Sequence, residues 1–222
     1  LFKTLDKKIG LDNVLIVLSA DHGGPDTPSY LAEHKIPAGY VDLSSWEKDS
    51  AIKRLKKRFD IKGKLIEKFE HPYLYLSTEV NKNLAIDRVA LDQAISSELA
   101  VFAGVHSAIP SKAIEQGQLD DNYVNQMVKN NFHPLRSGDF YVVFKPNWFI
   151  NDFDGLTVAS THGSPWRYDT YVPVVFAGAG IEDNNIHRRI HTVDIAPTLS
   201  AYLGIKPPSG SVGEVLFEVF ED

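Results

Sequence analysis

The sequence predicts an α/β fold in which a mostly parallel central sheet is flanked by helices and carries an inserted α+β subdomain. Two strand-like runs carry a histidine and a glycine at their C-terminal ends: the pair follows residues 14–18 in the first run and closes residues 156–164 in the second. Between them, residues 43–132 show a different order of helices and strands. We therefore expect residues 1–42 and 133–222 to form the core and residues 43–132 to form the inserted subdomain.

The first elements follow from spacing and turn residues. Leu1, Phe2, Leu5 and Ile9 repeat at helical spacing, which predicts a helix that ends at Gly10. A buried strand is expected at 14–18, a turn at 25–28, a short helix at 30–34 and an extended link at 36–41. Because the chain opens within or beside a helix, without an initiator methionine or a leader, we expect it to be the C-terminal part of a longer protein.

The expected insert begins with a basic amphipathic helix, because Ile52, Leu55 and Phe59 form one apolar stripe among lysines and arginines. Alternation predicts strands at 65–70 and 73–77, around Pro72, then a helix at 85–102, a strand at 101–109 and a helix at 121–129. The core resumes with strands at 138–146, 156–164 and 171–178. A helix at 191–204 follows, with Thr192 or Asp194 as its expected N-cap.

Composition excludes several classes of protein. The chain has 222 residues, 43% of them hydrophobic and 23% charged, which are ordinary globular values. A net charge of −6 argues against nucleic acid as the main partner. No run of about 18 apolar residues, the length of a membrane span, is present. Without cysteine there is no disulfide and no thiolate metal site, so a zinc site would use His, Asp or Glu.

The candidate metal ligands lie at the C-terminal ends of the two strand-like runs. Asp21 and His22 come after the first run, and His162 lies at the end of the second. Parallel strands deliver their C-terminal ends to one edge of a sheet, so these three side chains are expected to meet there. Gly23 and Gly24 permit the turn that would bring Asp21 and His22 to one ion. Carboxylate oxygen and imidazole nitrogen are good zinc ligands.

Simpler interpretations stand beside this one. Asp21 and His22 also fit a turn at a strand end with a capping aspartate. Asp169 and Ser164 either orient His162 or form a structural turn, and Asp194 is interpreted as a helix cap. The remaining histidines lack a strand-end setting and are not interpreted as ligands: His34, His71, His106, His133, His187 and His191.

Five stretches in a fixed order resemble the alkaline phosphatase superfamily, most closely its single-chain bacterial phosphate-irrepressible alkaline phosphatases. They are LSADHG (18–23), IPAGY (36–40), NFHPLRSGD (131–139), THGSP with YDT (161–165 and 168–170) and VDIAPTL (193–199). The resemblance implies the C-terminal portion of an alkaline-phosphatase-like core. It also implies two zinc ions, one bound by Asp21 and His22 and the other by His162.

The resemblance further implies an activity for the intact enzyme, namely hydrolysis of small-molecule phosphate monoesters through a covalent phosphoryl-enzyme intermediate. Localisation in the periplasm or outside the cell is implied in the same way. The family's nucleophile and phosphate-binding residues match no position here, and neither Arg136 nor Arg167 is assigned to those roles. The chain is therefore expected to need a missing N-terminal part and to be inactive alone.

Other functions remain open at this point. A phosphodiesterase or nucleotide pyrophosphatase of the same superfamily would use the same metal set. A metal-binding module without catalysis would describe the chain if it acts alone. A dinucleotide-binding domain is disfavoured, because no Gly-x-Gly-x-x-Gly follows a predicted strand.

Overall fold

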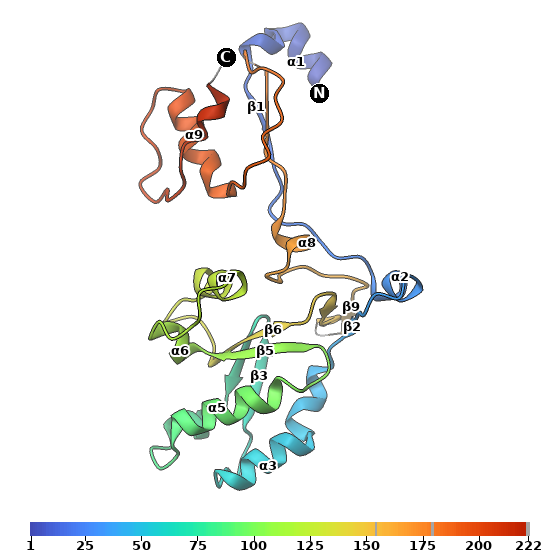
Figure 1. Ribbon diagram of the computed structural model, residues 1–222, viewed down its shortest axis with the longest axis vertical. Helices are drawn as coiled ribbons and strands as arrows, with labels where there is room; N and C mark the ends of the chain where they lie inside the picture. The colour runs from blue at the N-terminus through green and yellow to red at the C-terminus, as the bar shows by residue number, and fades with distance from the viewer. Residues whose placement is uncertain (154, 179, 221–222) are drawn as a thin grey trace. The chain divides into compact units, whose positions relative to one another are not determined.

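The computed structural model describes residues 1–153, 155–178 and 180–220 (Figure 1). Its internal contacts divide the chain into two compact units. The terminal unit consists of Leu1–Asp21 and Val172–Asp222, and the central unit consists of His22–Tyr171. The predicted boundaries of an inserted subdomain at 43 and 132 do not coincide with this division and stay a prediction.

The terminal unit is built from short helices and one pair of strands. Its elements are α1 (Phe2–Ile9), η1 (Leu11–Asn13), β1 (Ile16–Leu18), β10 (Val175–Ala177), η3 (Thr192–Asp194), α9 (Ile195–Tyr202) and η4 (Phe217–Val219). Helix α1 ends at Gly10, as predicted, with a φ of 77° that favours glycine. Asp194 occupies the N-cap position of α9, as predicted, but its side chain makes no capping hydrogen bond to that helix. Its carboxylate instead accepts the His191 N–H at 2.8 Å, in a capping box that opens η3, and the Glu214 N–H at 2.9 Å.

The pairing of β1 differs from the prediction. β1 runs antiparallel to β10, with Ile16 opposite Ala177 and Leu18 opposite Val175, and Leu18 is 63% exposed. The expectation that this run lies buried in a parallel sheet is therefore wrong for the described residues. Within the described residues, β1 pairs only with β10. A two-stranded sheet buries little surface, so the aliphatic side chains of β1 remain partly exposed.

The central unit contains a four-stranded antiparallel sheet in the order β3-β4-β6-β5 (Figure 1). Its strands are β3 (Ile66–Glu70), β4 (Tyr73–Leu76), β5 (Val105–Pro110) and β6 (Phe140–Phe144). All five residues of β6 are buried, as expected for a central strand. β6 was assigned to the predicted core, yet it pairs with β4 and β5 of the expected insert.

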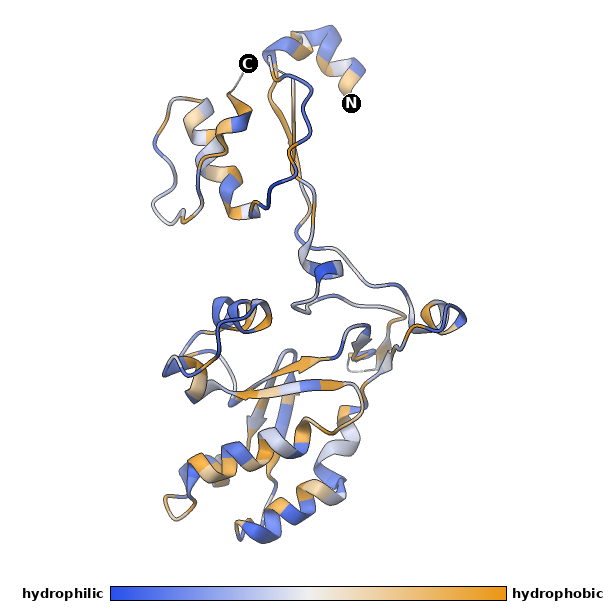
Figure 2. Ribbon diagram, in the orientation of Figure 1, coloured by the Kyte–Doolittle hydropathy of each residue, from blue (hydrophilic) through white to orange (hydrophobic). Residues whose placement is uncertain are grey.

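Side chains alternate between the two faces of this sheet along each strand, and helices pack on both faces. Phe140, Val142 and Phe144 pack with the buried residues of α3 (Ser50–Arg58) and α5 (Arg88–Leu99). Tyr141 and Val143 pack on the other side with α6 (Ser111–Glu115) and α7 (Tyr123–Asn131). Figure 2 shows hydrophobic and hydrophilic residues interleaved along α3 and α5, the pattern of helices with one buried face.

The remaining elements of the central unit are short. They are α2 (Pro28–Glu33), β2 (Gly39–Tyr40), η2 (Leu43–Lys48), α4 (Thr78–Lys82), β7 (Trp148–Phe149), β8 (Asp152–Phe153), β9 (Leu156–Thr157) and α8 (Arg167–Thr170). β2 and β7 form the one parallel pair among the described strands. The prediction of a strand at 156–164 is wrong after Thr157. Among the described strands, β9 pairs only with β8, in a short hairpin, and residues 158–164 form no strand.

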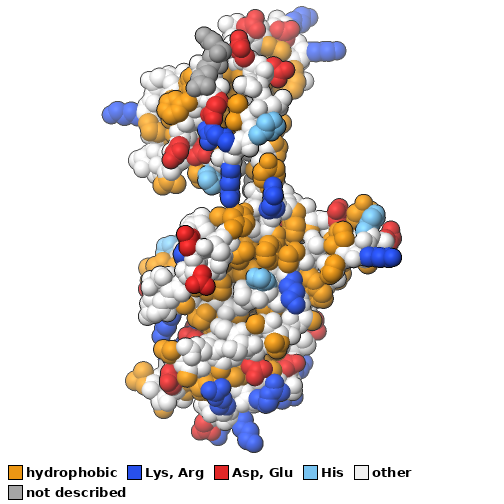
Figure 3. All heavy atoms as spheres, viewed as in Figure 1, with side chains coloured by type: hydrophobic (Ala, Val, Ile, Leu, Met, Phe, Trp, Pro, Cys, Tyr) orange, Lys and Arg blue, Asp and Glu red, His pale blue; other side chains and the backbone are white. Residues whose placement is uncertain are grey.

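The basic helix α3 carries ion pairs on the face that is turned away from the sheet. Lys56 pairs with Glu47 at 2.9 Å, and Arg54 pairs with Glu98 at 3.3 Å. Figure 3 shows Lys and Arg side chains interspersed with Asp and Glu at this end of the central unit, so no uniformly positive surface is visible in that view. Among the described helices, none has the length and apolar character needed to cross a membrane.

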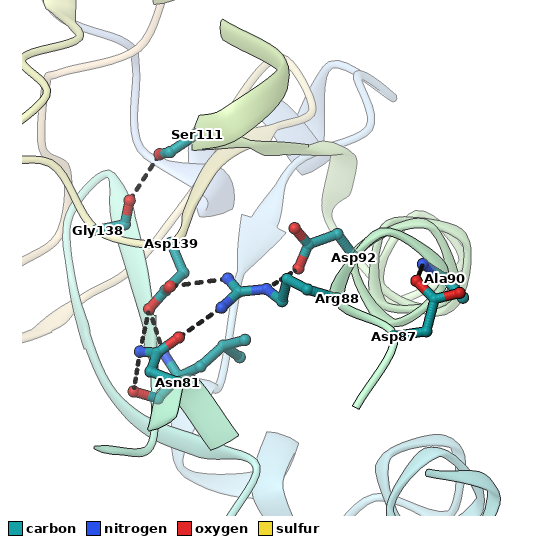
Figure 4. Close-up of polar contacts among 9 residues, drawn as sticks. Asn81, Asp87, Arg88, Ala90, Asp92, Ser111, Gly138 and Asp139 are labelled. Atoms are coloured by element: carbon teal, nitrogen blue, oxygen red, sulfur yellow. Dashed lines mark hydrogen bonds and ion pairs between the residues drawn. The ribbon is translucent and has the colours of Figure 1, made fainter. Parts of the chain in front are cut away.

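A network centred on Arg88 joins α5 to the sheet (Figure 4). The Arg88 guanidinium donates to Asp92 at 2.5 Å, to Asp139 at 2.8 Å and to the Asn81 side-chain oxygen at 2.5 Å. Asp139 also accepts the Leu76 N–H at 2.8 Å. Only 22% of the Arg88 side chain and 18% of the Asp139 side chain are exposed. The network therefore holds Asp139, the residue before β6, through several partly buried charged hydrogen bonds.

Candidate metal-binding site

Two of the three predicted ligands lie together in the central unit. His22 opens this unit, and His162 lies in the irregular segment that follows β9. Their rings stack with centroids 3.5 Å apart and planes at 8°. Although 140 positions separate the two residues in the sequence, the fold places one imidazole directly on the other.

The hydrogen bond of His22 indicates which ring nitrogen carries the proton. Its Nδ1 lies 2.6 Å from the Gly23 carbonyl oxygen. A carbonyl oxygen only accepts, so we assign the proton of neutral His22 to Nδ1 and the lone pair to Nε2. Histidines that bind metals commonly donate their second nitrogen to a carbonyl in this way. This tautomer is compatible with zinc binding through Nε2.

The stacked arrangement also bears on how many ions the pair would serve. A ring nitrogen presents its lone pair in the plane of the ring. Two rings in nearly parallel planes 3.5 Å apart cannot both direct a lone pair at one ion about 2 Å away. The donor chemistry thus fits zinc, and the geometry favours separate ions for His22 and His162.

The third predicted ligand, Asp21, precedes His22 in the chain and belongs to the terminal unit. Among the described residues, no group of three or more His, Asp or Glu side chains is arranged to hold a single metal ion.

Asp169 connects the turns that carry the two histidines. Its main-chain carbonyl accepts the Gly23 N–H at 2.8 Å, and its carboxylate accepts the Ser164 N–H at 2.7 Å and the Ser164 hydroxyl at 2.6 Å. Asp169 is only 4% exposed. The close approach requires glycine at 23, because a Cβ there would lie 2.0 Å from the Tyr168 carbonyl oxygen. Sequence reasoning left open whether Asp169 orients His162 or forms a structural turn, and these contacts with Gly23 and Ser164 are compatible with both.

A small pocket lies beside His162. It encloses about 330 Å³ of empty space, part of it open to solvent. Its lining comes from two sides, the sheet and the segment around His162: His71, Tyr141, Val142, Val143, Phe144, Trp148, Phe149, Thr161, His162, Gly163, Ser164, Pro165, Tyr168 and Asp169. His71 is the member that sequence reasoning missed. Its place between two predicted strands was visible, but its contact with Gly163, 92 positions away, was not.

Other histidines that were not interpreted as ligands have structural partners. His34 Nδ1 lies 2.9 Å from the Tyr30 carbonyl oxygen at the end of α2. His133 Nδ1 accepts the Leu135 N–H at 3.2 Å within a turn. His106 meets the Trp166 ring edge to face. These contacts agree with ordinary structural roles.

Comparison with known proteins identifies the family. Residues 1–165 match the model of the type I phosphodiesterase / nucleotide pyrophosphatase family. The chain belongs to this family, which is part of the alkaline phosphatase superfamily. The superfamily membership predicted from the five sequence stretches is therefore confirmed.

Individual relatives match nearly the whole chain. Over 98% of its length it is 29% identical to a Myroides odoratus protein named calcium-transporting ATPase, and 30% identical to alkaline phosphatase PafA of Elizabethkingia meningoseptica. The crystal structure of wild-type alkaline phosphatase PafA aligns with 99% of the chain at 29% identity and a TM-score of 0.80. The alkaline-phosphatase-like α/β fold is thus confirmed. The chain spans 39% of the length of both curated relatives and 41% of the solved chain.

Proposed function

We propose that this chain belongs to a zinc-dependent phosphohydrolase and supplies Asp21 and His22 to one zinc ion and His162 to the other. The observation that carries the proposal is the stacked His22–His162 pair, with the His22 tautomer set by Gly23. Membership of the phosphodiesterase family and similarity to an alkaline phosphatase support phosphate esters as substrates.

The chain's own residues would orient and hold the metal ligands. Gly23 keeps the His22 proton on Nδ1, and Asp169 holds both turns through one carbonyl and one carboxylate. Zinc bound there would neutralise charge on the phosphoryl group and lower the pKa of an attacking hydroxyl or water. In the intact protein we assign phosphate monoester hydrolysis through a covalent phosphoryl-enzyme intermediate, with a nucleophile outside these three residues.

Two subordinate proposals come from the sequence resemblance. We place the intact protein in the periplasm or outside the cell. We also expect the isolated chain to be inactive, because none of its positions matches the family's nucleophile and it offers each zinc ion at most two of the three or four ligands that a tight site needs.

Hydrolysis of phosphodiesters is the second candidate, because the matching family model carries that description. The test is to compare p-nitrophenyl phosphate with bis(p-nitrophenyl) phosphate as substrates of the intact, zinc-loaded protein. We expect a higher kcat/KM for the monoester. A preference for the diester would move the assignment to phosphodiesterase, and no turnover of either ester by a protein of verified zinc content would contradict catalysis.

A further inference from the structure

His71 is held firmly in the central unit at the turn between β3 and β4. Its ring lies against Phe144 at 5.9 Å between centroids and 16° between planes, and against Phe69 at 6.2 Å and 44°. Burial lowers the pKa of the His71 imidazole, and the nearby Gly163 carbonyl and Asp169 oppose that shift only in part. The His71 ring is thus packed against two aromatic side chains that also contact each other.

His71 makes a polar contact with the residue that follows His162. His71 Nε2 lies 3.0 Å from the Gly163 carbonyl oxygen. Since this oxygen can only accept, the neutral ring must carry its proton on Nε2. Its Nδ1 is buried and has no hydrogen-bond partner among the described residues. With the proton on Nε2, His71 donates to Gly163 and breaks no hydrogen bond at Nδ1, which has no partner among the described residues.

The backbone after His162 is shaped to this contact. Gly163 has a φ of 108°, which favours glycine, and a Cβ at this position would lie 2.9 Å from His71 Nε2. The next residue, Ser164, is bound through its N–H and hydroxyl by Asp169. Two consecutive residues after His162 are thus anchored by side chains from different elements, His71 from the hairpin and Asp169 from α8.

We propose that His71 is a positioning residue for His162. The Nε2–H of His71 holds the Gly163 carbonyl, and this contact sets the direction from which the His162 imidazole reaches its zinc ion. This inference rests on the proposed function, because it gives His162 the role of a ligand. The hydrogen bond, rather than the bulk of the ring, positions His162, because it joins the β3–β4 hairpin to the irregular segment that contains His162. Partners that orient metal ligands typically contribute about 10–100-fold to metal affinity or activity.

Two substitutions separate the hydrogen bond from the packing. His71→Phe keeps a ring against Phe69 and Phe144 but removes the donor, and His71→Gln keeps an N–H donor of similar reach. His34→Phe is the matched control, because this exposed histidine also contacts a backbone carbonyl but does not line the pocket. In the intact protein we expect His71→Phe to lower zinc affinity, measured by competition with a chelator, by about 10–100-fold. His71→Gln should recover to within a few-fold of wild type, and His34→Phe should match wild type.

A second measurement needs neither zinc nor activity. Hydrogen–deuterium exchange of the amides in residues 160–166 should be faster in zinc-free His71→Phe than in wild type, because one of the two anchors is lost. His71→Gln should restore protection. Equal zinc affinity and exchange in wild type and His71→Phe would overturn the inference, and so would equal impairment of the Phe and Gln variants.

His162→Ala, measured beside these variants, distinguishes the inference from the proposed function. If His162→Ala loses zinc affinity while His71→Phe does not, the positioning role alone is wrong. If His162→Ala leaves zinc affinity unchanged, the proposed function fails, and the role of His71 fails with it.

Discussion

Replacing His162 by alanine in the intact protein is expected to lower phosphomonoesterase activity by at least about 100-fold. A bound zinc ion contributes several kcal/mol of transition-state stabilisation, and each 1.4 kcal/mol is about a factor of ten in rate. The fold should survive, since the substitution changes an irregular segment whose neighbours Gly163 and Ser164 are held by His71 and Asp169. A chromogenic phosphate ester reports the rate, and circular dichroism reports the fold.

His34→Ala is the control for this experiment, because it removes an exposed imidazole at the end of α2. It should retain wild-type turnover. Should His162→Ala also retain it, in a protein whose zinc content has been verified, His162 would have no part in the reaction.

Replacing Arg88 by methionine is expected to lower the free energy of unfolding of the central unit by about 3 kcal/mol. Removal of one member of a buried ionic network leaves the others without compensation. Asp92 and Asp139 would lose their shared cation, and both are partly or fully buried. Burial already raises the pKa of the Asp92 carboxyl, and proximity to Asp139 raises it further. Urea denaturation followed by circular dichroism measures the loss.

Arg54→Met provides a matched comparison. The Arg54 side chain is 65% exposed and pairs with Glu98 on the surface, where such pairs contribute about 0–1 kcal/mol. We expect this variant to unfold close to wild type. If both arginine variants lowered the midpoint of urea denaturation equally, the Arg88 network would have no special part in stability.

Much of the central unit could be predicted from local pattern. Alternation at 65–70 and 73–77 predicted β3 and β4 to within a residue or two, and the spacing at 85–102 predicted α5. The pattern at 138–146 predicted β6 as a strand. These elements follow from periodicity, because each has a face that must be buried.

Strand partners could not be predicted in the same way. The aliphatic run at 14–18 suits a buried parallel strand, yet β1 pairs antiparallel with β10 and leaves Leu18 exposed. The strand predicted at 156–164 is only two residues long. Periodicity identifies which side chains prefer burial, whereas the partner and its direction depend on contacts between segments far apart in the sequence.

For the candidate site, the strand endings in the sequence identified the three candidate ligands, and the family resemblance assigned them to two zinc ions. His22 and His162 were predicted to meet, and the structure stacks them. His71 was dismissed, because a histidine before a proline in a hairpin has no local sign of contact with residue 163. Residues that act through a backbone carbonyl leave no motif, so only the fold reveals them.

Zinc content is the most direct test of the central claim that His22 and His162 serve two different zinc ions. Elemental analysis of the intact, dialysed protein should give two zinc ions per chain, and the His162→Ala variant should retain one. His22→Ala should lose the other ion and retain the one assigned to His162. A wild-type protein without bound zinc, or a His162→Ala variant that keeps two ions as tightly as wild type, would contradict the account.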